Sequence, residues 1–519
     1  MCAVLALACA AVLLFGEPSR ALAAGPCSGK VMYVAAHEDD TLLFQSPQLL
    51  EDVRANKCVQ TIFTTAGDAG KLGNGGKYWK GREAGAEAAY AQMANVANAW
   101  THSEPVVNGH KVHLATLSGA PGISIVFLRL PDGGPNGTGF PIPPPEPGGP
   151  SLTKLWRNGH GEMPAITEIE AVDGSAKYTY NGLVGTLIAL IESLSPLEIE
   201  TQNYTIPELV ELDHADHIIT GKFTQVAQAT YQGAHVLRAF QGYENFVATK
   251  SEPPANVFEP LLLPKREAFM AYVPHDEACT TKEEDCEATP YTEWLEREYV
   301  AGKESVPGAA AGSNQAVVPG VSVQLDGSGS FDPGDSTPSL SYAWVQTAGP
   351  KVMLSSPMVA KPTFTAPAIP TTLVFSLKVK NGVENGGHES LAATVTVNVE
   401  NPPPPPPSNG GGGGGGNPPP PPPPKENIVV KLSKTKVKLV VGKQAKHLVK
   451  VIAPGKSRVK CRGQLPKGAS CRVNAQGNVV IESSKSVKQA GTYHLVIDFA
   501  WQLGTDQRPL TVVFKRPSS

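Results

Sequence analysis

The sequence predicts a multidomain protein in which an N-terminal α/β domain is followed by two all-β domains. Its 519 residues are too many for one hydrophobic core. Strand-like and helix-like stretches alternate up to about residue 310, whereas short strand-like runs dominate the rest. A hydrophobic fraction of 41% with 18% charged residues is ordinary for globular protein.

Residues 1–24 are predicted to be a secretory signal peptide. An apolar stretch from Ala3 to Phe15 is followed by the small-residue pattern Ala21-Leu22-Ala23-Ala24, although the usual positive charge at the start is missing. No other segment approaches the ~20 apolar residues that a membrane span requires. We therefore expect a secreted protein, located in the periplasm, outside the cell or on its surface, with no membrane span.

The cysteines that remain after the leader also fit an exported protein. Their even number indicates disulfides. Cys27 and Cys58 each precede a predicted parallel strand, so neighbouring strands would bring them together. Sequential pairing predicts the bonds Cys27–Cys58, Cys279–Cys286 and Cys461–Cys471. Because no two cysteines form a CxxC pair, a zinc cluster made of cysteines is not expected.

Residues 25–310 are expected to form the α/β domain, with a Rossmann-like, mostly parallel sheet, because short β-rich runs alternate with helices of ordinary length. Strands are expected at Val31–Ala36, Val59–Thr65, Ile123–Leu128, Leu197–Thr201 and Val236–Phe240, and helices at Gly81–Val96, Gly182–Ser193, Ile218–Gln232 and Pro264–Tyr272. The segment Pro131–Pro150, rich in Gly and Pro, is expected to be a long loop at the rim of the active face.

Residues 312–401 read as a β-sandwich, because short strands with alternating hydrophobicity are evenly spaced and include Trp344. The turn cluster from Asp326 to Pro333, the strand around Tyr342 and Trp344, and the Gly-Pro pair after Ala348 resemble PKD-type and related immunoglobulin-like modules. That resemblance implies a spacer or a weak binder of polysaccharide or protein, without catalytic residues.

Residues 402–425 are a linker of two proline tracts around a glycine run. Residues 426–519 again alternate and predict a second, immunoglobulin-like sandwich. From Lys425 to Ser519 there are 19 lysines and arginines against 4 acidic residues, although the whole chain has a net charge of −3. Such a basic domain would contact an anionic polymer or cell surface, or its charge would serve solubility alone. No specific nucleic-acid partner is expected.

Two short segments carry the residues for metal chemistry. His37, Asp39 and Asp40 follow the first predicted strand, and the carboxyl ends of parallel strands are where α/β proteins bind ligands. The second segment places His214 and His217 three residues apart, beside Asp213 and Asp216. Together they offer imidazole and carboxylate ligands for a catalytic metal and a further carboxylate that can act as a base.

These segments resemble the motifs of the LmbE-like, or PIG-L, family of zinc-dependent N-acetylglucosaminyl de-N-acetylases. The family has AHPDDE after its first strand and HPDH near a later helix; this chain has Ala36-His37-Glu38-Asp39-Asp40-Thr41 and His214-Ala215-Asp216-His217. The resemblance implies zinc held by His37, Asp40 and His217. It also implies Asp39 as general base, His214 as stabiliser of the oxyanion and proton donor to the leaving amine, and Asp216 as the residue that orients a histidine.

The glycine-rich segment Thr64–Gly70 and the pair Arg82-Glu83 lie where the family has its Gly-acidic loop and its arginine. We expect Arg82 and Asp68 to bind substrate, through a sugar hydroxyl or an anionic substituent. The alternatives are a surface arginine at a helix start and a simple turn residue. Glu38, Thr41 and Ala215 depart from the motifs, but none of them is an implied ligand.

The function expected from the sequence is therefore that of a secreted zinc deacetylase acting on N-acetylglucosamine-type sugars in a glycan or glycoconjugate. Iron(II) would suit the same mixed ligands. Two alternatives remain: a zinc amidohydrolase acting on another acylated amine, and a non-catalytic glycan-binding or adhesive protein.

Overall fold

The computed structural model describes residues 27–141, 148–207, 212–243, 253–276 and 291–401, and between residues 431 and 515 mainly the strands. The chain divides into two compact units, Met1–Pro405 and Pro406–Ser519. The predicted leader, the predicted linker and the predicted Cys279–Cys286 bond lie outside the described residues. No helix among the described residues is long and apolar enough to cross a lipid bilayer.

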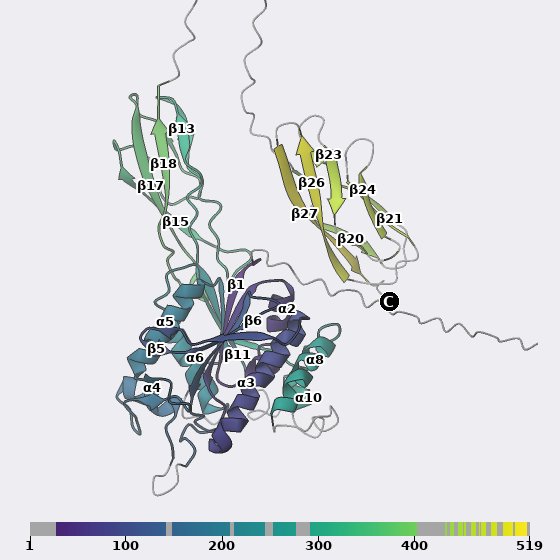
Figure 1. Cartoon of the computed structure of the whole chain (residues 1–519). Coiled ribbons are helices and arrows are strands. Elements are labelled where there is room, and N and C mark those ends of the chain that lie inside the picture. The colour runs from purple at the N-terminus through teal and green to yellow at the C-terminus, as the bar shows by residue number, and fades with distance from the viewer. Residues whose placement is uncertain are drawn as a thin grey trace, which may run out of the picture. The chain divides into compact units, whose positions relative to one another are not determined.

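The first unit contains an eight-stranded mixed sheet (Figure 1). Its order is β12 (Val300–Val306), β11 (His235–Phe240), β10 (Glu198–Gln202), β1 (Lys30–Ala35), β2 (Cys58–Thr65), β7 (Ile123–Leu130), β6 (His113–Leu117) and β3 (Trp100–Ser103). The strands from β11 to β7 are parallel, and β12 and β6 run antiparallel to their neighbours. The predicted α/β class is confirmed, with a sheet that is mixed at its edges.

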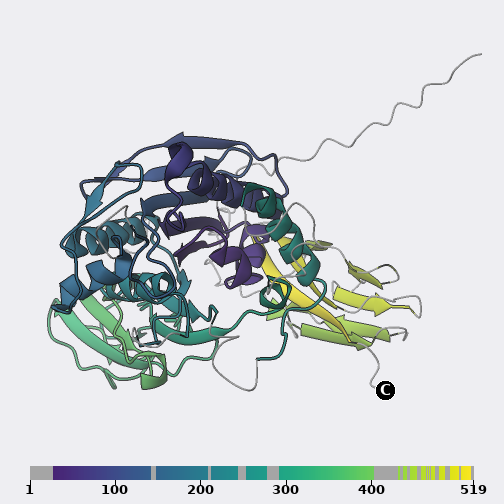
Figure 2. The ribbon, with the colours of Figure 1, turned by 90° about the horizontal axis from the view of Figure 1, so that it is seen from below.

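Helices cover both faces of this sheet, because the central strands are apolar on both sides. One face carries α1 (Asp40–Leu43), α2 (Gln48–Arg54), α3 (Gly73–Ala94), α8 (Leu262–Tyr272) and α10 (Tyr291–Leu295), and the other carries α4 (Leu152–His160), α5 (Tyr180–Leu194) and α6 (Ala215–Gln228). Alternate residues of β1 enter the two cores: Val31 and Tyr33 pack in the first, Met32 and Val34 in the second. Figure 2 shows the strands between the two groups of helices.

Smaller elements complete the domain. A short 3-10 helix, η1 (Val273–His275), follows α8, and two small hairpins are formed by β4 (Val106–Val107) with β5 (His110–Lys111) and by β8 (Ile169–Glu170) with β9 (Lys177–Tyr178). The predicted disulfide between Cys27 and Cys58 is present. It joins the starts of the neighbouring strands β1 and β2.

A β-sandwich follows the α/β domain within the first unit. One sheet has the order β13 (Gln315–Val317), β18 (Ala393–Val399), β17 (Thr371–Lys380) and β15 (Ser341–Ala348), and β14 (Ser322–Gln324) pairs with β16 (Thr363–Thr365). Trp344 is buried in its core, and a 3-10 helix, η2 (Val383–Asn385), follows β17. At the junction, Asn381 Nδ2 donates to the carbonyl of Ser305 at 2.7 Å and to Asp332 at 3.0 Å.

Every element described in the second unit is a strand, in line with the predicted all-β domain. Its sheets are β20 (Lys436–Val440), β27 (Gly504–Lys515), β26 (Gly491–Trp501) and β23 (Arg458–Arg462); β21 (Ala445–Val449), β25 (Val479–Ser483) and β24 (Ala469–Val473); and β19 (Lys431–Leu432) with β22 (Val451–Ile452). Cys471 is disulfide-bonded, while the side chain of Cys461 lies outside the described residues. An immunoglobulin-like topology for this unit stays a prediction.

Candidate metal centre

The two sequence segments meet at the carboxyl edge of the sheet. β1 ends at Ala35, so His37 lies on the turn into α1 and Asp40 is the first residue of that helix, whereas His214 is the N-cap of α6. Because β1 and β10 are parallel neighbours, the loops after them lie side by side. His37 Nδ1 and His217 Nε2 are consequently 3.3 Å apart, although 180 residues separate them in the chain.

The three predicted metal ligands form a small triangle. His37 Nδ1 lies 3.2 Å from Asp40 Oδ2, and His217 Nε2 lies 3.0 Å from Asp40 Oδ1. In a tetrahedral zinc site with bonds of about 2.0–2.1 Å, ligand atoms are about 3.3 Å apart. Asp40 Oδ1 is buried, and among the described residues its one polar contact is this one with His217. This donor set fits a zinc-sized ion.

A second group of donors lies on the other side of the His37 ring. The ligand atoms of His37, Asp132, His214 and Asp216 lie within 4.8 Å of one another. From His37 Nε2, however, the carboxylates of Asp216 and Asp132 are 3.6 and 3.8 Å away. The contacts of His37 and His217 with Asp40 are shorter, at 3.2 and 3.0 Å, and each histidine faces a different oxygen of that carboxylate. The ligand atoms of His37, His214 and His217 likewise lie within 4.8 Å of one another.

The electrostatics of the centre favour a cation. Burial lowers the pKa of His217, but the carboxylates of Asp213 and Asp40 outweigh this effect and raise the pKa to about 10. Burial works against the ionised form of Asp40, yet His217 and His37 hold the pKa of its carboxyl well below the usual range. The carboxylates of Asp40 and Asp213 therefore stabilise positive charge between them. A divalent ion would supply this charge, and the imidazoles could then be neutral.

Asp213 fixes the orientation of His217. Its Oδ1 lies 2.9 Å from His217 Nδ1 and also accepts the backbone N–H groups of His214 and Tyr243, at 2.8 and 2.9 Å. With Nδ1–H donating to Asp213, the lone pair on Nε2 faces the ligand triangle. A Cβ on Gly242 would lie 2.6 Å from Asp213 and 2.9 Å from His217, so the close approach of this segment requires glycine. The sequence analysis named Asp213 only as one of two carboxylates beside the histidines and did not predict that it orients His217.

Asp39, the predicted base, is held by Arg82. Nη2 of Arg82 lies 2.5 Å from Asp39 Oδ1, its Nη1 donates to the carbonyl of Gly67 at 2.9 Å, and its Nε donates to Tyr272 at 2.8 Å. Arg82 is 7% exposed. All three nitrogens of the Arg82 guanidinium thus have partners within the protein. Arg82 is not the surface arginine at a helix start that was the alternative prediction. A contact between Arg82 and a sugar stays a prediction.

His214 lies beside the ligands with a defined tautomer. Its Nδ1 accepts the backbone N–H of Asp216 at 3.2 Å, so the proton of the neutral ring is on Nε2. Burial, together with positive charge on His37 and His217, lowers the pKa of His214 to about 3. The ring is therefore neutral at physiological pH and can donate a hydrogen bond from Nε2.

Asp216 and Asp68 tie the surrounding loops together. Asp216 Oδ2 accepts the N–H of Gly133 at 2.7 Å, and Asp68 accepts the N–H groups of Asp132 and Gly70 at 2.8 and 3.0 Å. Both carboxylates are buried. Asp68 has the hydrogen bonds of a turn residue, and its contact with a sugar stays a prediction. Sequence reasoning missed Asp132. Its position just after β7, at the same edge of the sheet, was the available signal.

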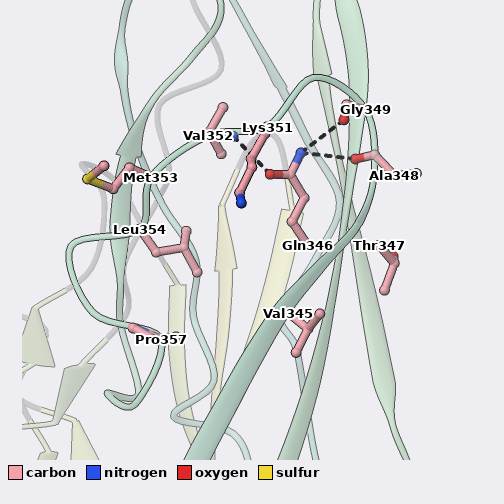
Figure 3. Close-up of a pocket in the computed structure, with 10 residues that line it drawn as sticks. All are labelled: Val345, Gln346, Thr347, Ala348, Gly349, Lys351, Val352, Met353, Leu354 and Pro357. Carbon is pink, nitrogen blue, oxygen red and sulfur yellow. Dashed lines mark hydrogen bonds between the residues drawn. The ribbon is translucent and has the colours of Figure 1, made fainter.

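A pocket of 820 Å³ lies elsewhere, in the β-sandwich (Figure 3). It is lined by side chains of β15 and of the loop that follows, among them Val345, Met353 and Leu354. Gln346 holds this loop: its Nε2 donates to the carbonyls of Ala348, Gly349 and Pro350, and its Oε1 accepts from Val352 N. Among the described residues that line it there is no acidic or histidine side chain, and Lys351 is the one charged residue.

Comparisons with known proteins identify the sandwich. Residues 311–399 match a family model described as a PKD domain, and they form a PKD domain. A solved PKD domain of the KIAA 1837 protein is 28% identical, covers 21% of this chain and 92% of its own, and has a TM-score of 0.15. The titin immunoglobulin tandem A164–A165 is 13% identical over 41% of this chain and 97% of its own, with a TM-score of 0.14. No curated protein matches the chain.

The metal centre lies outside the segment that the family model matches. The match confirms the resemblance of residues 311–399 to PKD modules. The resemblance to the LmbE-like family rests on the residues of the candidate metal centre and stays a prediction.

Proposed function

We propose that this protein is a metal-dependent amidohydrolase that removes the acetyl group from N-acetylglucosamine-type sugars in a glycan or glycoconjugate outside the cytoplasm. The observation that carries the proposal is the triangle of His37, Asp40 and His217, with Asp39 and His214 directly beside it. The resemblance of these two motifs to the LmbE-like family supports the choice of substrate. The disulfide Cys27–Cys58 supports an oxidising compartment.

The chain's own residues suit amide hydrolysis. A zinc or iron(II) ion held by His37, Asp40 and His217 would polarise an acetamide carbonyl and acidify water. Asp39 has one oxygen on Arg82, so its other oxygen takes the proton from the attacking water. The same proton then goes to the departing nitrogen, which balances the hydrolysis.

His214 donates its Nε2–H to the oxygen on which negative charge develops, because its Nδ1 is occupied by the N–H of Asp216. Asp213 and Asp216 act as positioning residues for the imidazoles.

The test uses the full chain, wild type beside Asp39→Asn, with Asp326→Asn as a control on an exposed carboxylate of the PKD domain. Metal content and amine release from an N-acetylglucosamine oligomer are measured. We expect about one ion per chain in all three proteins and a loss of about 10²–10⁴ in rate for Asp39→Asn alone.

The remaining outcomes separate the alternatives. Bound metal without amine release from any acetylated sugar would favour a different acylated amine or a binding role, and longer acyl donors would distinguish these two. Absence of metal from the purified wild type after incubation with zinc would contradict the metal centre itself.

A further inference from the structure

The short helix α1 carries two groups of the metal centre. Asp40, the predicted ligand, is its first residue, and Asp39, the predicted base, is its N-cap. The backbone N–H of Leu43 donates to the carbonyl of Asp39 at 3.0 Å, and the N–H of Phe44 donates to the carbonyl of Asp40 at 2.8 Å. The backbone at the end of α1 therefore helps to determine where both acidic residues lie.

The end of α1 also contacts the other half of the metal centre. The ring centre of Phe44 lies 6.0 Å from that of His217, in an edge-to-face arrangement, and 5.1 Å from that of Tyr243, whose ring stacks on His217. Because Asp40 and His217 have to reach the same ion, a movement of α1 against α6 would change the distance between two ligands.

A helix as short as α1 needs support from outside. It has 4 residues, and no basic side chain lies in its last turn. Forming a single helical turn is unfavourable without further contacts. The last carbonyls of a helix have no partner within it, and Leu43 is the last residue of α1. The group that binds the carbonyl of Leu43 therefore matters for the place of the whole turn.

The group that binds this carbonyl is the side chain of Lys265, from α8. Its Nζ donates to the carbonyl of Leu43 at 2.9 Å and to the carbonyl of Arg297 at 3.0 Å. Lys265 is 1% exposed. Burying an ammonium group is costly unless it is hydrogen-bonded, and a cation near the end of a helix stabilises its carbonyls. Leu43 and Phe269 of α8 also belong to the same apolar core.

We propose that Lys265 is a positioning residue of the metal centre. By holding the carbonyl of Leu43, it fixes α1, and with it Asp39 and Asp40, in place against His217. The inference rests on the metal centre of the proposed function and adds a residue that lies 222 positions after Leu43 in the chain. A lysine that only supported the fold would contribute to stability without changing the zinc affinity of the folded protein.

The test compares the full-length wild type with Lys265→Met, which keeps an unbranched side chain and removes its hydrogen-bond donors. Two quantities are measured: the zinc affinity, by competition with a chelator, and the free energy of unfolding of the metal-free protein, in urea. We expect Lys265→Met to bind zinc about tenfold more weakly, at the lower end of the effect of residues that orient metal ligands without touching the metal. Its stability should fall as well.

His235→Met is the matched control for a general loss of stability. His235 is 0% exposed, and its ring nitrogens lie 2.7 Å from the carbonyl of Gly233 and 2.7 Å from Oε1 of Gln228. It is the first residue of β11, so it lies at the edge of the sheet opposite to the carboxyl ends of the parallel strands. The control variant should lose stability and keep the zinc affinity of the wild type.

Wild-type zinc affinity in folded Lys265→Met would overturn the inference, and so would an equal loss of affinity in His235→Met. If Lys265→Met does not fold, Lys265→Gln replaces it. This variant keeps two donors on a shorter side chain and should also bind zinc more weakly than wild type, so an unchanged affinity would overturn the inference too. Failure of the proposed metal centre would be distinct, because the wild type itself would then bind no zinc.

Discussion

Oδ1 of Asp213 lies 2.9 Å from Nδ1 of His217, and both side chains are fully buried. This contact determines which nitrogen of His217 faces the ligand triangle. Carboxylates that hold the remote nitrogen of a metal-bound imidazole commonly raise its basicity and lock its orientation. The residue before the HADH motif is therefore as much part of the centre as the motif itself.

Replacement of Asp213 by asparagine should weaken metal binding by about 10–100-fold, because the amide no longer accepts the Nδ1 proton as strongly. Zinc affinity is measured by competition with a chromophoric chelator. Asp52→Asn is the matched control, since Asp52 is also buried and accepts a hydrogen bond, from Tyr33, on another part of the domain. Equal zinc affinity in wild type and Asp213→Asn would contradict the role given to Asp213.

Arg82→Lys should lower kcat/KM by about 10–100-fold and leave the metal content unchanged. One ammonium group cannot reach Asp39, Gly67 and Tyr272 together, so Asp39 loses its fixed orientation. Arg266→Lys, which changes a surface pair with Glu296, serves as the control. If Arg82→Lys reacts at the wild-type rate, the orientation of Asp39 does not depend on the hydrogen bonds of Arg82.

Gly67 tests the packing around Arg82 without changing a charged group. Its φ is +51°, and a Cβ there would lie 2.5 Å from Arg82 Nη1 and 2.6 Å from Glu38 Oε2. Gly67→Ala should therefore cost about 2–3 kcal/mol in stability and reduce activity, through backbone strain and displacement of Arg82. Gly75→Ala is the control, because Gly75 has a φ of +66° and nothing within 4 Å of its added Cβ. Gly75→Ala should lower the free energy of unfolding by about 1 kcal/mol, through backbone strain alone. Equal losses of stability in Gly67→Ala and Gly75→Ala would refute the steric argument.

Hydrophobic periodicity predicts buried strands well and exposed edge strands poorly, and the outcome for this fold follows that rule. Strands buried on both faces are continuous apolar runs, so β1, β2 and β7 were predicted within two residues at each end. The edge strand β12 was not predicted, because Val300–Val306 contains charged residues and is mostly half-buried. Its pairing depends on β11, which lies about 60 residues earlier in the chain.

The site shows the same division. The predicted ligands lie together because the order of parallel strands alone brings their loops to one edge. The partners of Arg82 and the approach of Asp132 depend on loop backbone conformation. Arg129, for example, has a φ of +58° at the end of β7, and it binds Glu83 through two nitrogens. No local pattern in the sequence indicates such a conformation at an arginine.

Glu87 gives a pH-dependent prediction away from the metal ligands. Burial, helped by the nearby charge of Glu83 and opposed by Arg129, raises the pKa of Glu87 from 4.5 to about 7. The folded protein thus binds this proton more tightly than the unfolded chain does. The stability that the group contributes is complete below pH 4.5 and is lost as the pH rises through about 7.

Glu87→Gln removes this titration, so the variant should gain stability relative to wild type between pH 5 and pH 8. The expected gain is about 1 kcal/mol, because solvent screens part of the effect at this partly exposed side chain. Urea unfolding of both proteins at the two pH values measures it. Glu104→Gln is the control: Lys111 lowers the pKa of the exposed Glu104, so its variant should show no such gain. The difference in free energy of unfolding between wild type and Glu87→Gln should change from pH 5 to pH 8. If it is the same at both pH values, Glu87 is ionised in the folded protein across this range.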